Sequence, residues 1–301
     1  MSIKELIGSF ATCAKSRKEV LFIYTWQAFI CLLIASNGVP PLLETLKLIL
    51  TITFVGYSIY FYNDLKDIKS DLKNKELGNP TPASRPLGSG KISRSMMKKF
   101  IVFSAVLGLL VSFTINVQVF ILQLVYILLG IIYSTEPIRL KKRFLVKQPT
   151  IIAGMMIAHL SGGLTLGVVN NAILFLMAIN ALFTMGMNPL ADLRDRRADS
   201  IMGVKSIPVV LGPETTVRLS LSVLFAVGAS FVVGYFRLGF NMAMLILGVI
   251  IISTLIYIFI PLLKKWDDPV YLHFVLFKRG APLYIILQFV IFLGVLPLSF
   301  F

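Results

Sequence analysis

The stretch Asn63-Asp64-Leu65-Lys66-Asp67-Ile68-Lys69-Ser70-Asp71 decides the architecture, because it places three carboxylates where a long apolar run, residues 46–62, ends. If a helix continues through it at ~100° per residue, Asn63, Asp64, Asp67 and Asp71 fall within about 100° of arc. They then form one acidic stripe on one helix face. Carboxylates at this spacing repel one another unless cations lie among them. At a membrane boundary, such a stripe indicates a functional site.

The rest of the chain indicates a membrane protein. It has 301 residues, of which 57% are hydrophobic, and its mean hydropathy is +0.86. An ordinary soluble domain is about 45–50% apolar. Apolar runs approaching twenty residues recur along the whole chain, which excludes a soluble core with a single anchor. The runs are continuous and not alternating, so we expect residues 1–301 to form one all-α domain with several spans and no β-barrel.

Nine of these apolar runs are candidate spans. Their approximate limits are residues 20–35, 46–62, 100–115, 120–133, 150–169, 172–190, 216–235, 242–263 and 281–297. The first twenty residues lack the apolar core and the cleavage site of a signal peptide, and we expect them to form a cytoplasmic amphipathic segment that leads into the first span.

The loops between the runs alternate in charge. Residues 66–99 carry nine Lys or Arg and residues 139–147 carry five, and residues 192–205 and 264–279 are also charged. The opposite loops are short and nearly uncharged. The positive-inside rule then predicts a protein of the cell membrane with a cytoplasmic N-terminus, cytoplasmic charged loops and, with nine spans, an external C-terminus. The net charge of +15 fits loops that face anionic membrane lipids or an anionic substrate better than it fits nucleic acid.

A second acidic stripe follows the sixth apolar run. Asp192, Asp195 and Asp199 repeat the i, i+3, i+7 spacing and fall within about 60° of arc on a continuing helix. The two stripes are four spans apart on the same inferred side of the membrane. This pattern predicts two related four-helix halves, at about residues 20–135 and 149–263, and one further helix. Sites at the interface of internal repeats are common in polytopic membrane proteins.

Facing each other, the two stripes would form a carboxylate-lined cup. Its hard oxygen ligands suit Mg²⁺, which is often shared with substrate phosphates. Basic residues occur in the neighbouring loops, namely Arg85, Lys91, Arg94, Arg139, Lys141, Lys142, Arg143, Arg194, Arg196, Arg197 and Lys205. This combination is suited to a Mg²⁺-bound diphosphate, with the metal joining carboxylates to phosphate oxygens and the basic residues neutralising the remaining charge.

Such a site makes diphosphate a better leaving group, because charge builds on it as the C–O bond breaks. If the group is allylic, its departure leaves a carbocation that could alkylate a second lipophilic substrate. A dry aromatic pocket would stabilise the carbocation and exclude water. The aromatic candidates by position are Tyr57, Tyr60, Phe61, Tyr62, Tyr126 and Tyr133.

Further motifs occur between and after the stripes. They are Ser84-Arg85-Pro86-Leu87 with Ser89-Gly90-Lys91-Ile92-Ser93, Tyr133-Ser134 through Pro137 to Leu140-Lys141, and Gly203-Val204-Lys205-Ser206-Ile207-Pro208 ending in Leu211-Gly212. Together with residues 63–71 (NDxxDxxxD) and 192–199 (DxxDxxxD), they make the chain resemble the UbiA family of intramembrane prenyltransferases over nearly its whole length. The resemblance implies nine transmembrane helices around a central cavity, capped by cytoplasmic loops.

The resemblance also implies roles for single residues. The expected metal ligands are Asp64, Asp67, Asp71, Asp192, Asp195 and Asp199. The expected diphosphate-binding residues are Asn63, Arg17, Arg85, Lys141 and Lys205. The expected catalytic residues are Asp64, Asp67, Asp195, Asp199, Tyr133 and Lys141. Tyr133 and Lys141 correspond to the family's tyrosine–lysine pair, at a longer spacing than its compact form.

We therefore expect a Mg²⁺-dependent prenyltransferase that ionises an isoprenyl diphosphate and transfers the prenyl group to a lipophilic acceptor, releasing diphosphate. The acceptor is either an aromatic ring, as in quinone synthesis, or a glyceryl ether, as in archaeal lipid synthesis. No residue identifies the base that a hydroxyl acceptor needs, so both remain open. The rival interpretations are an ion transporter or channel, with the stripes as its ion path, and a membrane diphosphatase, with water as the acceptor. The transporter fits less well because both stripes lie at one face of the membrane.

Overall fold

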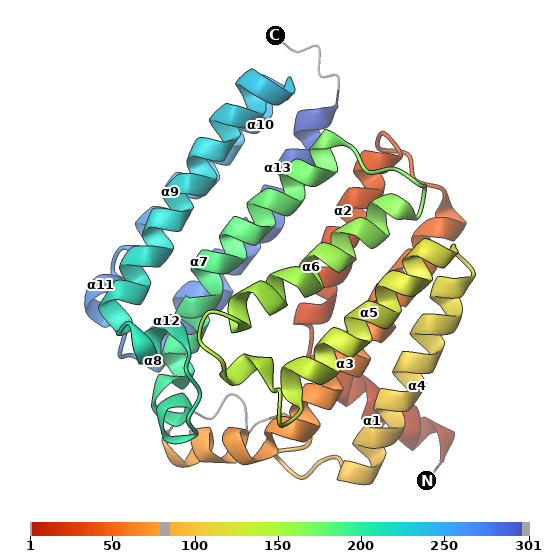
Figure 1. Cartoon of the computed structure of the whole chain (residues 1–301), viewed down its shortest axis with the longest axis vertical. Helices are drawn as coiled ribbons and strands as arrows, with labels where there is room; N and C mark the ends of the chain where they lie inside the picture. The colour runs from red at the N-terminus through yellow and green to blue at the C-terminus, as the bar shows by residue number, and fades with distance from the viewer. Residues whose placement is uncertain (1, 79–84, 297–301) are drawn as a thin grey trace.

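The chain folds as a bundle of helices, and the computed structural model describes residues 2–78 and 85–296 (Figure 1). No strand occurs within these two ranges. The prediction of an all-α fold is therefore confirmed for the described residues. Ser84, from one of the quoted motifs, and residue 297, the expected end of the last span, lie outside the described residues.

The described part contains short π and 3₁₀ segments as well as α-helices. In chain order the elements are α1 (Ile3–Ser16), π-helix η1 (Val20–Thr25), α2 (Trp26–Ala35), α3 (Leu42–Glu76), α4 (Arg94–Phe113), α5 (Val117–Ser134), 3₁₀-helix η3 (Leu140–Lys142), α6 (Lys147–Leu164), α7 (Asn171–Ile201), α8 (Ile207–Val210), α9 (Pro213–Leu238), α10 (Met242–Phe259), α11 (Leu262–Lys265), α12 (Pro269–His273), π-helix η4 (Phe274–Gly280) and α13 (Ala281–Val295).

Seven helical segments of the described chain are long and apolar enough to cross a membrane. They are α3, α4, α5, α7, α9 and the segments Met242–Lys265 and Pro269–Val295. The helices Ile3–Ser16 and Val20–Ala35, which are bent by 68° relative to each other, make an eighth if they are counted as one span. The chain is therefore a multi-pass membrane protein.

Helix α6 lies where the sequence predicts a further span, residues 150–169, but it is not among the helices that meet this standard of length and hydropathy. It begins with Lys147 and Gln148 and carries His159 near its middle. Gln148 and His159 are both buried, because α6 packs against α2, α5 and α7. Its polar side chains therefore contact other helices and not lipid, which explains how a polar helix lies within an apolar bundle.

A glycine allows α6 to approach α2 closely. A Cβ atom at Gly162 would lie 2.1 Å from the carbonyl oxygen of Ala28 and 2.8 Å from the Cβ of Cys31. A backbone oxygen cannot move aside as a flexible side chain can, so this position has no room for any side chain. Small residues at helix contacts are typical of membrane bundles, where close backbone packing replaces the hydrophobic effect.

A chain of hydrogen bonds links four helices through the interior. Gln27 Nε2 of α2 donates to the Tyr284 hydroxyl of α13 (2.6 Å), which donates to Asn180 Oδ1 of α7 (2.7 Å). Asn180 Nδ2 in turn bonds His159 Nε2 of α6 (2.8 Å). All four side chains are buried. Polar contacts of this kind fix helix positions where lipid offers no alternative partner.

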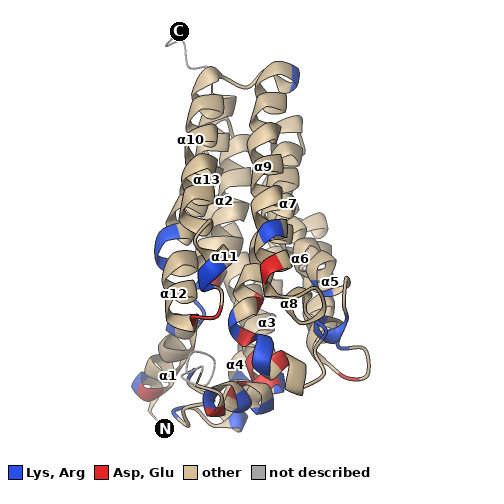
Figure 2. Ribbon diagram, turned by 90° about the vertical axis from the view of Figure 1, so that its left-hand side faces the viewer, with Lys and Arg blue, Asp and Glu red and all other residues tan. Residues whose placement is uncertain are grey.

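The two helices that carry the acidic stripes extend beyond their apolar parts. Helix α3 has 35 residues, which is about 52 Å of helix at ~1.5 Å per residue, whereas the hydrocarbon core of a bilayer is about 30 Å thick. In Figure 1 the end of α3 crosses the lower end of the bundle toward the end of α7. Charged residues gather at this same end (Figure 2). The stripes therefore lie at the polar end of the molecule, near each other.

We predict that Gly162→Ala destabilises the protein, because the added methyl group would collide with the backbone of α2. Overpacking of this kind costs about 1–3 kcal/mol. The melting temperature of the purified protein in detergent, read from tryptophan fluorescence, should fall by several degrees. The matched control is Gly228→Ala in α9, where the added Cβ would meet a side chain, Ile252, at 3.3 Å. Equal melting temperatures for both variants would contradict the prediction.

Candidate functional site

The two acidic stripes line one cavity at the charged end of the bundle. The cavity has a volume of about 170 Å³. Four carboxylates line it, Asp67 and Asp71 from α3 and Asp195 and Asp199 from α7. The other lining residues are Asn63, Ser70, Asn74, Arg85, Tyr133, Arg139, Lys141, Lys142, Lys147, Met202 and Val204. The stripes meet there because both helices continue through their acidic segments and lie in contact.

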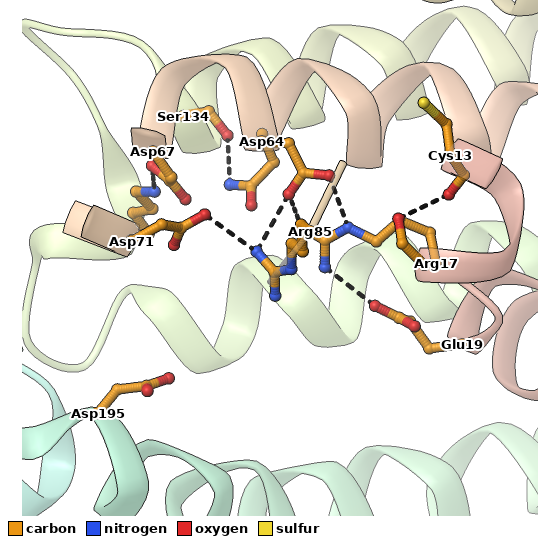
Figure 3. A network of polar contacts seen from close by, with 12 residues as sticks. Cys13, Arg17, Glu19, Asp64, Asp67, Asp71, Arg85, Ser134 and Asp195 are labelled. Atoms are coloured by element: carbon orange, nitrogen blue, oxygen red, sulfur yellow. Dashed lines mark hydrogen bonds and ion pairs between the residues drawn. The ribbon is translucent and has the colours of Figure 1, made fainter. Parts of the chain in front are cut away.

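Asp64 is 2% exposed and is absent from the described lining of this cavity. Figure 3 shows it in contact with Arg17 and Arg85. Arg17 holds it with two hydrogen bonds, one from Nε to Oδ2 (3.0 Å) and one from Nη2 to Oδ1. Arg85 Nη1 also donates to Oδ1 (3.1 Å). Arg17 further pairs with Glu19 through Nη1 (3.0 Å). The Asp64 carboxylate therefore joins three segments: the junction after α1, α3 and the loop before α4.

Asp67 and Asp71 line the cavity and are also paired with cations. Asp67 Oδ1 accepts hydrogen bonds from Lys141 Nζ and from Arg139 Nη2 (3.2 Å). Asp71 Oδ2 accepts from Arg85 Nη1 at 3.4 Å. These basic residues come from the segment after α5 and the segment before α4. The mutual repulsion within the stripe is therefore offset by cations from two other parts of the chain.

Asn63 fixes the start of the stripe against α5. Its Nδ2 donates to Ser134 Oγ (3.1 Å), and the neighbouring Tyr62 hydroxyl bonds the Thr135 hydroxyl (2.6 Å). Tyr133, one residue before Ser134, lines the cavity. These contacts hold the end of α5 at the cavity wall.

The second stripe is held by a different set of partners. Asp192 is 8% exposed, and its Oδ1 accepts from Lys147 Nζ of α6 at 2.6 Å. Asp195 pairs with its neighbour Arg194 at 3.0 Å. Asp199 and Lys147 line the cavity, whereas Asp192 is absent from its lining. The Asp192–Lys147 pair therefore connects α6 to α7 at the edge of the cavity.

Two loops meet beside the cavity. The backbone N–H of Lys205, after α7, donates to the carbonyl oxygen of Lys142, after α5, at 3.0 Å. The loop turns at Gly203, whose φ of 68° favours glycine. Val204 N–H then bonds the Asp199 carbonyl at 2.8 Å. Lys205 thus contributes a backbone link, and its side chain is not part of the described cavity lining.

Burial and pairing act in opposite directions on two of the cations. Burial opposes the charge on Arg17, but Asp64 and Glu19 outweigh it and raise the pKa of the guanidinium above its ordinary value. Burial lowers the pKa of the Lys141 ammonium, although Asp67 acts in the opposite direction. Arg17 therefore remains charged, whereas Lys141 holds its proton less firmly than an exposed lysine does. A bound anion beside Lys141 would favour its charged form.

The carboxylates fit a metal only if it has other ligands too. Among the described residues, no group of three Asp, Glu, His or Cys side chains is placed to hold a metal ion on its own. The four lining carboxylates instead come from two helices on one cavity. Mg²⁺ usually takes one or two carboxylates together with water and substrate phosphates. The hard oxygen donors of the cavity therefore fit a Mg²⁺ ion that is shared with a phosphate-bearing ligand.

Most of the expected site residues come together. Those that line the cavity are Asn63, Asp67, Asp71, Arg85, Tyr133, Lys141, Asp195 and Asp199. The others lie around it: Arg17 and Asp64 as a buried pair, Asp192 on Lys147, and Lys205 through its backbone. Of the six aromatic candidates, only Tyr133 is in the lining. Tyr57 and Phe61 stack on each other with ring centroids 5.4 Å apart, in a cluster between α1, α3 and α4.

The sequence did not single out three polar residues of the lining, Ser70, Asn74 and Lys147. Ser70 and Asn74 continue the face of the first stripe, since Asn74 lies three residues after Asp71 and seven after Asp67. Their spacing was therefore a usable signal. For Lys147 the sequence spacing gave no signal, because this residue begins a helix that is far from both stripes in sequence. Its place at the cavity follows from the packing of α6 on α7.

Comparison with known proteins identifies relatives of the chain. The sequence model described as the UbiA prenyltransferase family matches residues 24–297. A digeranylgeranylglyceryl phosphate synthase of Methanocaldococcus jannaschii is 30% identical over 202 residues, which is 65% of this chain and 65% of that relative. A 4-hydroxybenzoate octaprenyltransferase of Shewanella loihica is 24% identical over 241 residues, which is 78% of this chain and 79% of that relative.

The fold is also that of a solved structure. A UbiA homologue from Archaeoglobus fulgidus, bound to DMAPP and Mg²⁺, superposes with a TM-score of 0.63 over 91% of this chain and 99% of that chain, at 18% identity. The family match covers nearly the whole chain and includes both acidic stripes. From this match and the shared fold, we conclude that the chain belongs to the UbiA prenyltransferase family.

Proposed function

We propose that this prenyltransferase is Mg²⁺-dependent, ionises an isoprenyl diphosphate and transfers the prenyl group to a lipophilic acceptor, with release of diphosphate. One observation carries the proposal: carboxylates from both stripes and five basic side chains line the same cavity at the polar end of an apolar bundle. The solved homologue that is bound to DMAPP and Mg²⁺ supports the donor and the metal. The relatives named as a synthase and an octaprenyltransferase support the class of reaction.

The carboxylates of the lining would hold the metal, with Asn63 as a neutral oxygen donor beside them. These residues are Asp67, Asp71, Asp195 and Asp199. When bound, Mg²⁺ would supply charge neutralisation on the diphosphate oxygens. Asp64 and Asp192, also expected as ligands, would instead hold Arg17 and Lys147 in place. Either carboxylate could contribute to metal binding only after its cation moves.

The basic side chains would bind the diphosphate and stabilise its negative charge as the C–O bond breaks. Lys141 and Arg139 are held at the cavity by Asp67, and Arg85 is held there by Asp64 and Asp71. They are therefore already positioned, so little reorganisation is required when the anion binds. Tyr133 lies in the same lining, where its ring could face the developing carbocation.

The charge distribution supports a particular arrangement in the membrane. We propose nine crossings, with α6 as the one that its own hydropathy does not identify and with the loops beside the cavity as a cytoplasmic cap. The N-terminus and the site would face the cytoplasm, and the C-terminus would lie outside the cell membrane. The two halves at about residues 20–135 and 149–263 would each supply one acidic stripe. The prenyl chain and the acceptor would enter from the membrane lipids.

The named relatives support two candidate classes of acceptor. One is a hydroxybenzoate-type aromatic ring, and the other is the hydroxyl of a prenyl glyceryl ether phosphate. The experiment is to incubate the purified protein with Mg²⁺ and radiolabelled geranylgeranyl diphosphate, with each acceptor separately. We expect a prenylated product with one acceptor and none when Mg²⁺ is chelated. Free prenol alone would indicate a diphosphatase, and ion flux in vesicles without turnover would indicate a transporter.

We predict that Asp67→Asn and Asp195→Ala each reduce turnover by at least ~10²-fold, as the loss of a transition-state contact does. The two positions come from different stripes, so equal losses would support one shared site. Glu214→Gln is the matched control, because this carboxylate is exposed on α9 and pairs only with Arg218 among the described residues. Full activity in either test variant, with the melting temperature unchanged, would refute the assignment.

A second prediction concerns the Asp192–Lys147 pair. Lys147→Met should leave Asp192 buried without its cation and destabilise the protein by about 3–5 kcal/mol. The double variant Lys147→Met/Asp192→Leu should recover most of that stability, because it removes both charges. Thermal unfolding in detergent measures both effects. If Asp192 only holds α6 in place, the double variant also retains measurable turnover; complete loss of turnover in a stable double variant would show that the pair contacts the substrate or metal.

A further inference from the structure

Helix α1 has an apolar stripe that the bundle covers only in part. Cys13 is buried and Phe10 is half-buried, but Leu6, Ile7 and Ile3 on the same stripe are 39%, 64% and 78% exposed. The exposed N-terminal end of α1 nevertheless carries a cap that stabilises the helix. Ser2 and Glu5 form a reciprocal capping box, with Ser2 N–H donating to Glu5 Oε2 (2.8 Å) and Glu5 N–H donating to Ser2 Oγ (3.3 Å).

The position of Phe10 places α1 at the depth where the membrane spans begin. Its ring centroid lies 6.0 Å from that of Phe54 on α3 and 5.9 Å from that of Phe103 on α4, both within spanning helices. Phe103 is itself 53% exposed, on a side of α4 that also exposes Val102 and Val106. The apolar stripe of α1 is therefore continuous with a surface that faces lipid. In Figure 1, α1 projects outward at the lower end of the bundle, beyond α4.

Basic residues surround this stripe without internal partners. Lys4, Lys15 and Lys18 lie exposed on or directly after α1, and Arg94, Lys98 and Lys99 lie exposed at the start of α4. No ion pair joins any of these six to a described carboxylate. A cation in the first turn of a helix opposes the helix dipole, so Arg94, the first residue of α4, is unfavourable there without an external anion. Phosphate groups at the membrane surface supply such anions next to an apolar layer.

We propose that α1 is a membrane-surface helix that binds anionic lipid, with Ile3, Leu6 and Ile7 in the acyl boundary and the surrounding lysines on lipid phosphates. Binding of α1 to lipid would also affect the acidic cavity, because Arg17 directly follows α1 and is hydrogen-bonded to Asp64. The 68° bend after α1 turns the helix away from the axis of the following helix. Lipid-bound α1 would therefore hold Arg17 against Asp64. This second part rests on the proposed function, whereas lipid binding does not.

The test places a fluorescent label at Gly8→Cys, on the basic side of α1. A Cβ there meets nothing within 4 Å, and the native cysteines, Cys13 and Cys31, are buried and protected from labelling. The full chain is reconstituted in nanodiscs of phosphatidylcholine, with or without phosphatidylglycerol, that contain a lipid with a nitroxide on its headgroup. We expect stronger quenching of the label when phosphatidylglycerol is present. Quenching that is absent in both lipids would overturn the proposal.

Three variants of the labelled protein separate the contributions. Ile3→Glu/Ile7→Glu should abolish the quenching in both lipids. Lys4→Gln/Lys15→Gln should weaken the bound state by about fivefold per lysine in anionic lipid only. Lys69→Gln/Lys75→Gln is the matched control, since it removes two exposed lysines from α3 and should change nothing. If the apolar variant quenches normally, the lipid assignment is wrong. If protection of the label instead increases with protein concentration in detergent, a second copy covers the stripe and the proposal fails.

Turnover in the same nanodiscs tests the link to the site. We expect Ile3→Glu/Ile7→Glu to reduce prenyl transfer severalfold, with the same variant and wild type equally active in detergent. Loss of quenching with unchanged turnover in nanodiscs would overturn the link while leaving lipid binding intact. If wild type shows no turnover in any medium, the proposed function fails instead, and the quenching result still decides whether α1 binds lipid.

Discussion

Ion pairs between the acidic stripes and cations from other segments are the interactions on which this site depends. A carboxylate at the end of an apolar helix is costly unless it is paired. Asp64 and Asp67 on α3 and Asp192 on α7 are each bound by a basic residue from a different element. These pairs connect the residue after α1, the segment after α5 and the start of α6 to the helices that carry the stripes. Folding of the bundle therefore assembles the cavity and neutralises it in one arrangement.

The same pairs divide the carboxylates into two groups. Asp67, Asp71, Asp195 and Asp199 line the cavity, where a metal and a diphosphate could reach them. Asp64 and Asp192 are absent from the described lining, and each is paired with a long basic side chain. Under the proposed function, a carboxylate that lines the cavity would exchange its cation for a metal, because a ligand in the cavity can reach it directly. A buried one cannot do so without moving the helix or loop that supplies its partner, so its present contribution is to position Arg17 or Lys147.

Helix α6 shows how a membrane bundle can contain a polar helix. Its glycine at position 162 allows direct backbone contact with α2, and His159 joins a chain of hydrogen bonds through Asn180 and Tyr284. Protein surrounds its polar groups, so they need no lipid-compatible surface. At its first residue, the same helix supplies Lys147 to the cavity. Helix α6 therefore packs closely against α2 in the interior and also contributes a positive charge to the cavity at the polar end.

The sequence by itself determined the all-α class, the charged end of the bundle and most of the cavity lining. These follow from local patterns: apolar run length, charge alternation, and a helical spacing that puts Asp67 with Asp71 and Asp195 with Asp199 on one face. Only the tertiary structure decided which carboxylates face the cavity, that Lys147 joins them and that α6 is buried by its neighbours. The physical reason is that a helical repeat fixes a residue's direction relative to its own helix. Its partner and its exposure are fixed by how that helix packs against segments distant in the chain.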